Sequence, residues 1–292
     1  MNPIELKIKA NEHRIAILDM IHKANSGHTG GSLSAIDILT VLYYGSARGQ
    51  RLMKFNPREP NWNEQDYFIL SKGHACPALY VILADLGFFD KEELNHFRQM
   101  GALLQGHPVR KIPGVTMTTG TLGQGFSVSV GLAMCLKMEK AGNRVYVMLG
   151  DGEVQEGQVW EAAMAAAHYK CDNLIAIMDH NGVQLDGYVR AIMNIDPIVD
   201  KFKAFGWNVI HIREGHDITE LLGAFSKAIE PLRKPTIIIA DTVKGKGVSF
   251  AENKASYHGV ALSKEEMAVA IPALQKEIAE LRGDGSLREP SP

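Results

Sequence analysis

The residues best suited to ligand chemistry come shortly after two apolar runs of the sequence. Asp151 lies in a Gly-Asp-Gly turn after the run 145–149, and Asn181 lies in a His-Asn-Gly-Val turn after the run 174–178. If the runs are neighbouring strands, the two turns meet at the carboxyl edge of a sheet, where open α/β sheets bind ligands. A carboxylate, an amide oxygen and a backbone carbonyl oxygen are too few ligands to enclose a cation. Magnesium commonly completes such a shell with phosphate oxygens and water.

Gly152, directly after Asp151, suits a diphosphate that must approach the backbone closely. A helix that begins nearby would direct its N–H groups at the same anion. Taken singly, Gly-Asp-Gly and Asn-Gly are common turns, and a turn explains each of them as well as a site does. Their shared strand-to-loop context favours a diphosphate bound together with a metal ion.

Four further candidates are histidines that lie beside glycine in loop-like segments: His28, His74, His107 and His258. Imidazole groups can shuttle protons near neutral pH or form hydrogen bonds with oxygen-rich ligands. One such histidine alone is more often structural, so the prediction depends on their coming together. Lys244 and Lys246 could steer a phosphate, but a solvated basic turn explains them at least as well.

Short apolar strands and helical stretches alternate around these residues. Strands are predicted at 67–70, 145–149, 174–178, 209–212 and 236–240, and helices at 4–23, 159–169 and 218–229. Ser34 with Asp37, and Asp90 with Glu93, predict two more helix starts of the capping-box type. Continuous apolar strands between helices indicate an α/β fold whose doubly wound, mostly parallel sheet is covered by helices on both faces.

Length and composition exclude several classes of protein. The 292 residues, 46% of them hydrophobic, are enough for one large core, so one domain is predicted at 1–282 and a polar, disordered tail at 283–292. The net charge of −2 gives no reason to expect nucleic acid or an acidic membrane as a partner. Three scattered cysteines and no membrane-spanning apolar run predict a soluble cytoplasmic protein.

The segment GDGEVQEGQVWEA, followed by NLIAIMDHNGVQLDG, resembles the thiamine-diphosphate motif, and its flanks are similar to those of transketolases over nearly the whole chain. The segments SGHTGG, DYFILSKGHACPALY and LLQGHPVRKIPGVTMTTGTLGQG are also similar to transketolase segments. The resemblance implies the thiamine-diphosphate-binding fold, in its diphosphate-binding domain. It also implies that Asp151, Asn181 and the Val183 carbonyl hold Mg²⁺, and that Gly152 and Glu153 pass beside the diphosphate.

The same resemblance assigns roles to the remaining candidates. It implies that His28 and His107 face a sugar, that His74 lies by the cofactor's reactive and diphosphate ends, and that His258 reaches the diphosphate or the substrate. Gly120, Thr121 and Leu122 would lie against the cofactor. The chain departs from the family at His180, often Asp, at Thr29 and Thr121, usually Pro, and at Val109, where an acid is common. These departures leave the metal ligands in place and bear on substrate preference.

After His258 the sequence predicts one more helix and the tail, which leaves no room for the pyrimidine-binding domain of a full-length transketolase. We therefore expect a partner chain that carries the pyrimidine-binding and C-terminal domains, in an α2β2 assembly. Together they would move a two-carbon ketol unit between sugar phosphates of the pentose phosphate type. Glu156 matches a family glutamate at the subunit interface, although an acid in a first helical turn is also ordinary. The alternatives are a subunit of another thiamine enzyme, of the deoxyxylulose-phosphate synthase or 2-oxo acid dehydrogenase kind, and a noncatalytic cofactor-binding regulator.

Overall fold

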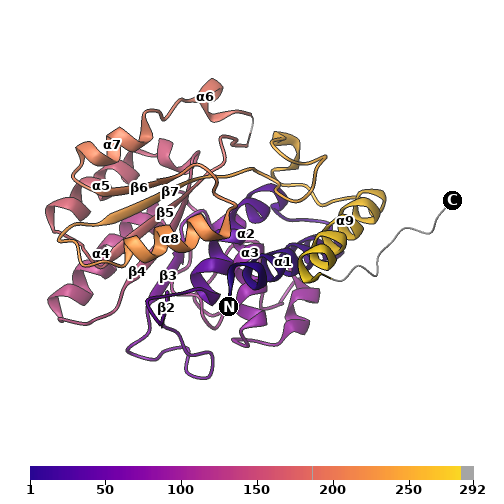
Figure 1. Ribbon diagram of the computed structural model, residues 1–292, viewed down its shortest axis with the longest axis horizontal. Coiled ribbons are helices and arrows are strands. Elements are labelled where there is room, and N and C mark those ends of the chain that lie inside the picture. The colour runs from indigo at the N-terminus through magenta and orange to yellow at the C-terminus, as the bar shows by residue number, and fades with distance from the viewer. Residues whose placement is uncertain (186, 284–292) are drawn as a thin grey trace.

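Five parallel strands form the central sheet in the order β3-β4-β5-β7-β6 (Figure 1). In chain order they are β3 (Tyr67–Leu70), β4 (Val145–Gly150), β5 (Leu174–His180), β6 (Asn208–Ile212) and β7 (Thr236–Asp241). Each overlaps a predicted strand, so the predicted α/β fold with a parallel sheet is confirmed. The computed structural model describes residues 1–185 and 187–283, and the predicted tail therefore lies outside the described residues apart from Gly283.

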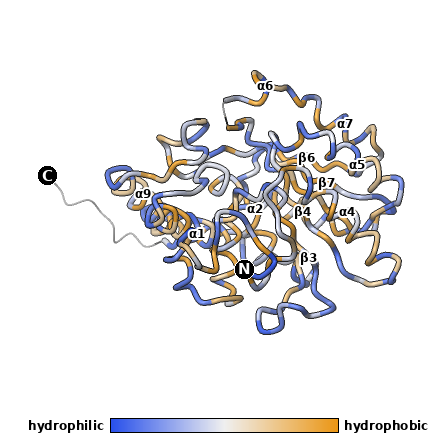
Figure 2. The backbone as a smooth tube through the Cα atoms, turned by 180° about the vertical axis from the view of Figure 1, so that it is seen from behind, coloured by the Kyte–Doolittle hydropathy of each residue, from blue (hydrophilic) through white to orange (hydrophobic). Residues whose placement is uncertain are grey.

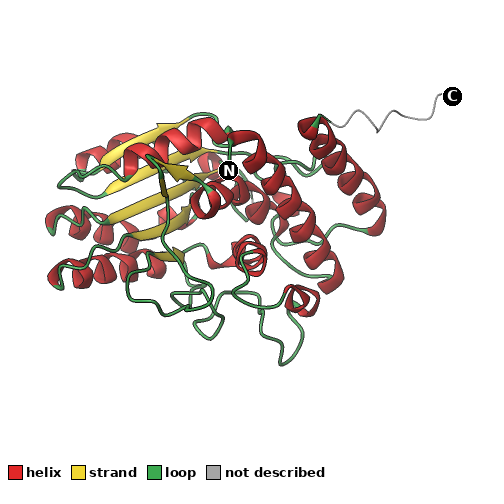
Figure 3. Cartoon of the chain, turned by 60° about the horizontal axis from the view of Figure 1, so that its bottom comes forward, coloured by secondary structure: helices red, strands yellow, loops and turns green. Residues whose placement is uncertain are grey.

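Helices cover both faces of this sheet (Figure 3). One face carries α1 (Pro3–Ala24), α2 (Thr29–Tyr44), α3 (Cys76–Asp85), α8 (Ile218–Ala228) and α9 (Lys264–Arg282), and the other carries α4 (Gln124–Met138), α5 (Gly157–His168) and α7 (Ile198–Ala204). The smaller elements are the β1 (Ser46–Ala47) and β2 (Gln50–Arg51) hairpin, α6 (Val189–Ile192), and the 3₁₀ turns η1 (Gly73–Ala75), η2 (Lys91–His96), η3 (Glu153–Gln155) and η4 (Ala255–Tyr257). Within the described ranges, no helix is long and apolar enough to cross a membrane.

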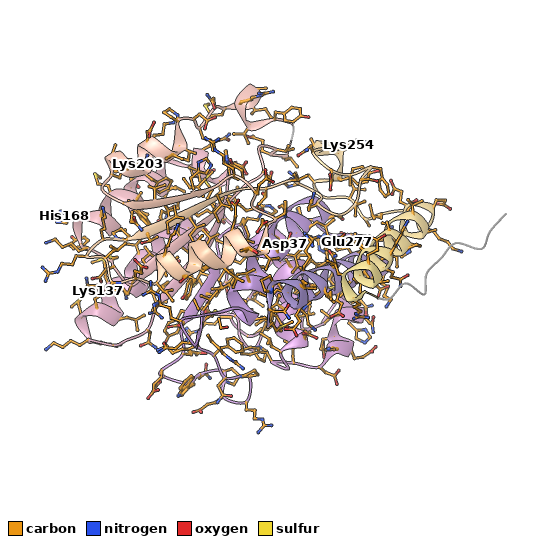
Figure 4. The ribbon with its side chains drawn as sticks, viewed as in Figure 1. Asp37, Lys137, His168, Lys203, Lys254 and Glu277 are labelled. Atoms are coloured by element: carbon orange, nitrogen blue, oxygen red, sulfur yellow. The ribbon has the colours of Figure 1, made fainter. Side chains whose placement is uncertain are left out.

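Alternate residues of each strand enter two separate apolar clusters, one on each face of the sheet. Phe68, Tyr146 and Ile175 pack with the helices of the first face, whereas Ile69, Val147 and Ala176 pack with those of the second. Both faces of the sheet are therefore buried, which explains why the strands are continuous apolar runs in the sequence (Figure 2). Lys137, His168 and Lys203, near the C-terminal ends of α4, α5 and α7, point outward at one edge of the molecule, while Asp37 lies inside it (Figure 4).

The capping-box prediction at Ser34 is wrong, because α2 already begins at Thr29 with His28 as its N-cap residue. Ser34 is buried in the helix, and its hydroxyl donates a 2.6 Å hydrogen bond to Asp179. Asp90 does cap a helix, by accepting from the N–H of Glu92 at 2.9 Å, but the helix is the 3₁₀ turn η2. Ser34 and Asp37 are thus polar residues in the interior of α2, and their spacing resembles a capping box although their side chains make tertiary contacts.

Candidate active site

A cavity of about 420 Å³ lies where β4, β5 and β7 end and where the segment after β3 turns into η1. Its walls include ten of the predicted site residues together with two lysines: His28, His74, Gly120, Leu122, Asp151, Gly152, Glu153, Asn181, Val183, His258, Lys72 and Lys244. β4 pairs directly with β5, and Gly150 lies opposite Asp179. The turns after these strands therefore meet at the carboxyl edge of the sheet, as the sequence predicted.

The three proposed metal ligands lie around the junction of these two turns. The buried carboxylate of Asp151 accepts a hydrogen bond from the N–H of Gly182, and the Asn181 side-chain oxygen accepts one from the N–H of Val183 at 3.1 Å. Burial, followed by the negative charge of Asp179, raises the pKa of Asp151 to about 6. In the described part of the chain no cationic side chain forms an ion pair with Asp151. A carboxylate that burial disfavours and nothing neutralises is suited to bind a cation.

Two buried lysines supply positive charge to the same cavity. Lys244 donates hydrogen bonds to the carbonyl of Val183 at 2.9 Å and to Nδ1 of His258 at 2.8 Å. Burial, and next the charge of Lys72, lowers the pKa of Lys244 to about 8. Lys72 forms an ion pair with the fully buried Asp179. Burial alone would raise the pKa of Asp179, but the charge of Lys72 and hydrogen bonds from Lys72, Ser34 and Thr242 together outweigh it, so the pKa is lowered.

Lys244 and Lys246 have different environments. Lys244 is 2% exposed and reaches the cavity, whereas Lys246 is half-buried, lies outside the cavity lining and pairs with Glu252 at 3.6 Å. Of the two explanations that the sequence left open, the phosphate-steering one suits Lys244 and the solvated turn describes Lys246.

Glu153 joins three loops of the site. Its carboxylate accepts from the N–H of Gly123 at 2.8 Å, from the N–H of Gly150 at 3.1 Å, and from the hydroxyl of Ser71. Burial raises its pKa. At Gly152 a Cβ would lie 3.2 Å from the Cβ of Gln184, so the backbone here is closely approached. Glu153 therefore fixes the geometry of the cavity wall that the diphosphate was predicted to touch.

The four predicted histidines come from four separate segments of the chain: three line the cavity and His107 lies next to them in an adjoining one. The ring of His28 lies 5.2 Å from that of His74, 5.3 Å from that of His258 and 6.3 Å from that of His107. His74 and His258 are also 5.3 Å apart. Such a cluster presents several hydrogen-bonding nitrogens to one ligand.

These imidazoles are held in the neutral form. Burial, and then the guanidinium of Arg98, lowers the pKa of His28 to about 4. Burial, and then Lys244, lowers the pKa of His258 to about 3, and burial lowers the pKa of His74 well below its usual value. Each neutral ring offers one donor and one acceptor nitrogen at neutral pH, which suits hydroxyl groups.

His107 and Thr121 lie at the edge of this arrangement. Both line an adjoining, more open cavity that also includes Gly120, where a Cβ would be 3.2 Å from the His107 ring. Glu156 is exposed at the rim of the main cavity as the N-cap residue of α5, and its side chain makes no capping hydrogen bond. Thr121 is thus the one predicted cofactor residue placed beside the main cavity and absent from its lining.

The family described as "Transketolase, thiamine diphosphate binding domain" matches residues 6–277 of the chain. The chain belongs to the transketolase family. The expected transketolase resemblance is therefore confirmed over 272 residues of the sequence, counting from 6 to 277.

Relatives of the chain fall into two groups by length. It is 44% identical to the 6-deoxy-6-sulfo-D-fructose transketolase subunit SqwG of Clostridium sp. (strain MSTE9), covering 94% of this chain and 98% of that one. It is 37% identical to an apulose-4-phosphate transketolase subunit of Phocaeicola vulgatus, covering 96% and 98%. Against the transketolase of Rattus norvegicus the identity is 40%, but the chain spans 42% of that protein.

Solved transketolases have the same fold. The structure from Campylobacter jejuni superposes with a TM-score of 0.85 at 33% identity, covering 97% of this chain and 49% of that chain. The expectation that this sequence corresponds to the N-terminal section of a transketolase divided between two chains is confirmed by its matching length in the subunit relatives. The chain is accordingly a transketolase subunit, of the class of ketol-group transferases.

Sequence reasoning missed three residues of this candidate site: Lys72, Asp179 and Arg98. Lys72 directly precedes the Gly-His pair of His74, and Asp179 ends an apolar strand, so both had a local signal. Arg98 had none, because it reaches its position beside His28, with N to N at 3.3 Å, from an irregular segment at a positive φ of 62°.

Proposed function

We propose that this chain is the subunit of a two-chain transketolase that binds Mg²⁺ and the diphosphate of thiamine diphosphate. The observation that carries the proposal is that one cavity combines the oxygen set of Asp151, Asn181 and Val183 with the histidine cluster. A metal and diphosphate site explains the first set, and a sugar beside the cofactor explains the second.

The protein groups in the cavity suit Mg²⁺ and its anion. Asp151 and Asn181 would supply side-chain oxygens and Val183 a carbonyl, and phosphate oxygens and water would complete the shell. Lys244, already within hydrogen-bonding distance of Val183, would face the diphosphate. Gly152 permits close approach to the backbone, and its neighbour Glu153 holds the turn in place. When bound, thiamine diphosphate supplies the carbanion chemistry for breaking and remaking a carbon–carbon bond next to a carbonyl.

The histidines would bind and orient the sugar. His107 lines the more open adjoining cavity, whereas His28, His74 and His258 line the main cavity with Lys72 and Lys244. In the neutral rings of His28 and His258, Nδ1 already accepts from Arg98 and Lys244, so Nε2–H is the group that would donate to a sugar oxygen. The clustering of these rings favours a sugar over a 2-oxo acid, which has fewer hydroxyl groups to bind.

A partner would complete the enzyme. The subunit relatives are almost the same length as this chain, whereas the single-chain transketolases are more than twice as long. We therefore propose a partner with the pyrimidine-binding and C-terminal domains in an α2β2 assembly, with sugar phosphates as substrates and Glu156 close to the interface. The three free cysteines are in keeping with a cytoplasmic location.

The relatives suggest which donor ketoses to test. Their names specify 6-deoxy-6-sulfo-D-fructose and apulose 4-phosphate. The chain, co-purified with a candidate partner, would be assayed with Mg²⁺ and thiamine diphosphate for ketol transfer from each of these and from xylulose 5-phosphate. Turnover in the mixture, and in neither chain alone, is the expected result. A stable complex that binds the cofactor but transfers a unit from a 2-oxo acid instead would contradict the sugar assignment.

A further inference from the structure

A second cavity, of about 300 Å³, lies at the opposite end of β3 from the cofactor site. Its lining includes Asp66 and Tyr67 at the start of β3, whereas the cofactor cavity includes Lys72 and His74 beyond the end of that strand. The two cavities share no lining residue. The transketolase reaction assigned to the first cavity therefore leaves the second unexplained.

The inner wall of this second cavity is aromatic. The rings of Tyr43 and Phe55 lie 5.6 Å apart, and those of Phe55 and Phe88 lie 6.0 Å apart. Ile112 and Val115 add aliphatic surface from the loop across the cavity. Small-molecule sites are typically concave and mostly apolar with a few placed polar groups. The volume and the wall suit a single six-membered ring.

Tyr43 contributes a polar group to the aromatic wall of the cavity. Tyr43 is 3% exposed and lines the cavity, yet its hydroxyl makes no hydrogen bond with any residue in the described ranges. Burial is the cause that raises the pKa of this hydroxyl, so it stays protonated. Because this hydroxyl has no protein partner among the described residues, it is free to donate to, or accept from, a ligand hydroxyl in the cavity.

The rim of the cavity is positively charged. Arg110 and Lys111 are exposed, and neither forms an ion pair with a carboxylate of the described chain. The acid in the lining, Asp66, is already engaged, because its carboxylate accepts from the N–H of Lys54 at 2.9 Å and from the N–H of Arg144 at 2.7 Å. The unpaired charge at the entrance therefore favours an anionic ligand.

We propose that this cavity binds a hydroxylated single-ring aromatic acid. The ring packs against the edges of Phe55 and Phe88, the ring hydroxyl meets the hydroxyl of Tyr43, and the carboxylate lies at the rim near Arg110 and Lys111. The ring, the hydroxyl and the carboxylate of such a ligand would each contact a different feature of the cavity.

The loop that closes this cavity leads directly into the active site. It is held at its base by hydrogen bonds from the N–H of Arg110 to the Thr118 hydroxyl at 3.0 Å and from the N–H of Thr119 to the Pro108 carbonyl at 3.2 Å. His107 precedes this base and Gly120 follows it. At the loop tip Gly114, with φ of 84°, leaves no room for a Cβ against Phe88. A ligand that rests on the loop is thus positioned to shift His107.

The test uses the full chain and three probes: 3-(4-hydroxyphenyl)propionate, 3-phenylpropionate, which lacks the hydroxyl, and 3-(4-hydroxyphenyl)propanamide, which lacks the charge. Calorimetry would compare wild type with Tyr43→Phe, with the double variant Arg110→Gln/Lys111→Gln, and with the surface control Lys203→Gln. We expect Tyr43→Phe to weaken the hydroxylated acid about five-fold and to leave 3-phenylpropionate unchanged. The double variant should weaken both acids about ten-fold and leave the amide unchanged. NMR should show the His107 ring signals moving as the acid binds.

Two outcomes would overturn the proposal. The first is no saturable binding of the hydroxylated acid to the wild-type chain. The second is binding that none of the cavity variants alters relative to Lys203→Gln, which would place the ligand elsewhere. Equal affinity for the acid and the amide would refute the anionic class, and unmoved His107 signals would refute the link through the loop.

Discussion

The ammonium group of Lys244 donates a 2.9 Å hydrogen bond to the carbonyl oxygen of Val183, one of the three oxygens proposed to bind Mg²⁺. A buried cation next to a cation site is unfavourable unless an anion lies between the two charges. The diphosphate is such an anion, and its charge would offset both Mg²⁺ and Lys244. Burial and next the charge of Lys72 lower the pKa of Lys244 to about 8, so its charged form is disfavoured by the protein groups around it.

Replacing Lys244 tests this arrangement. We expect Lys244→Met to weaken thiamine diphosphate binding in the presence of Mg²⁺ by about 10- to 100-fold, because a buried charge-assisted hydrogen bond is lost. Lys246→Met, two residues away, is the matched control and should change the affinity less than about two-fold, because Lys246 lies outside the cavity lining and its partly exposed ion pair with Glu252 is worth little. Calorimetric titration of both variants measures the effect. Equal losses in the two would show that general positive charge, and not the position of Lys244, attracts the cofactor.

Asp151→Asn should abolish Mg²⁺-dependent cofactor binding while it stabilises the cofactor-free chain. The folded-state pKa of Asp151 is raised to about 6, above the ordinary value near 4, so ionising this carboxylate costs folding free energy. That cost is absent below about pH 4 and is complete above about pH 6, where it amounts to about 2–3 kcal/mol. Urea unfolding in EDTA at pH 4 and pH 7 should show a gap between wild type and variant at the higher pH. A gap of the same size at both values would argue against the raised pKa.

Much of the fold followed from the sequence because the sheet is buried on both faces. Alternate residues such as Phe68 and Ile69 enter opposite apolar clusters, so each strand reads as a short unbroken apolar run. The turns at Asp151 and Asn181 could be placed at one edge because parallel strands share their direction. The prediction at Ser34 failed because the same polar spacing serves a hydrogen bond to Asp179 across the core.

The residues that tune the site could not be predicted in the same way. Arg98 affects His28 through contact between segments 70 residues apart, and no local pattern encodes that approach. Lys244 and Lys246 look alike in sequence, and only their packing distinguishes the buried Lys244 from the half-buried Lys246. Residue type indicates which groups can ionise or bind a ligand, and burial and neighbouring charges determine the pKa values of those groups.

His28 should remain neutral to unusually low pH. Burial and then Arg98 lower its pKa to about 4, so its ring signals in an NMR titration should move around pH 4 and not near pH 6.5. Arg98→Gln should raise this midpoint, because it removes a positive charge whose guanidinium nitrogen lies 3.3 Å from Nδ1 of His28. Arg213→Gln is the control, because it removes one exposed arginine and so changes the net charge by the same amount. A midpoint that does not respond to Arg98→Gln would leave burial as the whole cause.

A buried ion pair supports the loop that carries Lys244. Arg14 is 1% exposed and pairs with Asp37, which is fully buried. Arg14 Nε also donates to the carbonyl of Lys246 at 3.1 Å. His216 accepts from the N–H of Val243 at 2.8 Å, so its other nitrogen, Nδ1, donates to Asp37 at 2.6 Å. Both ends of this network therefore contact the loop on either side of Lys244.

Arg14→Met should destabilise the chain by about 3–5 kcal/mol, because it leaves the Asp37 charge buried without its main partner. The double variant Arg14→Met/Asp37→Leu should recover part of that loss in urea unfolding at pH 7. The pH dependence of stability distinguishes loss of the charge pair from loss of side-chain packing. Burial would raise the pKa of Asp37, but Arg14 and His216 outweigh burial and lower it, so the pair's contribution is present above about pH 4 and is lost as the pH falls further. Wild type should consequently lose more stability between pH 4 and pH 3 than the double variant, and equal losses would show that the pair contributes no net charge interaction.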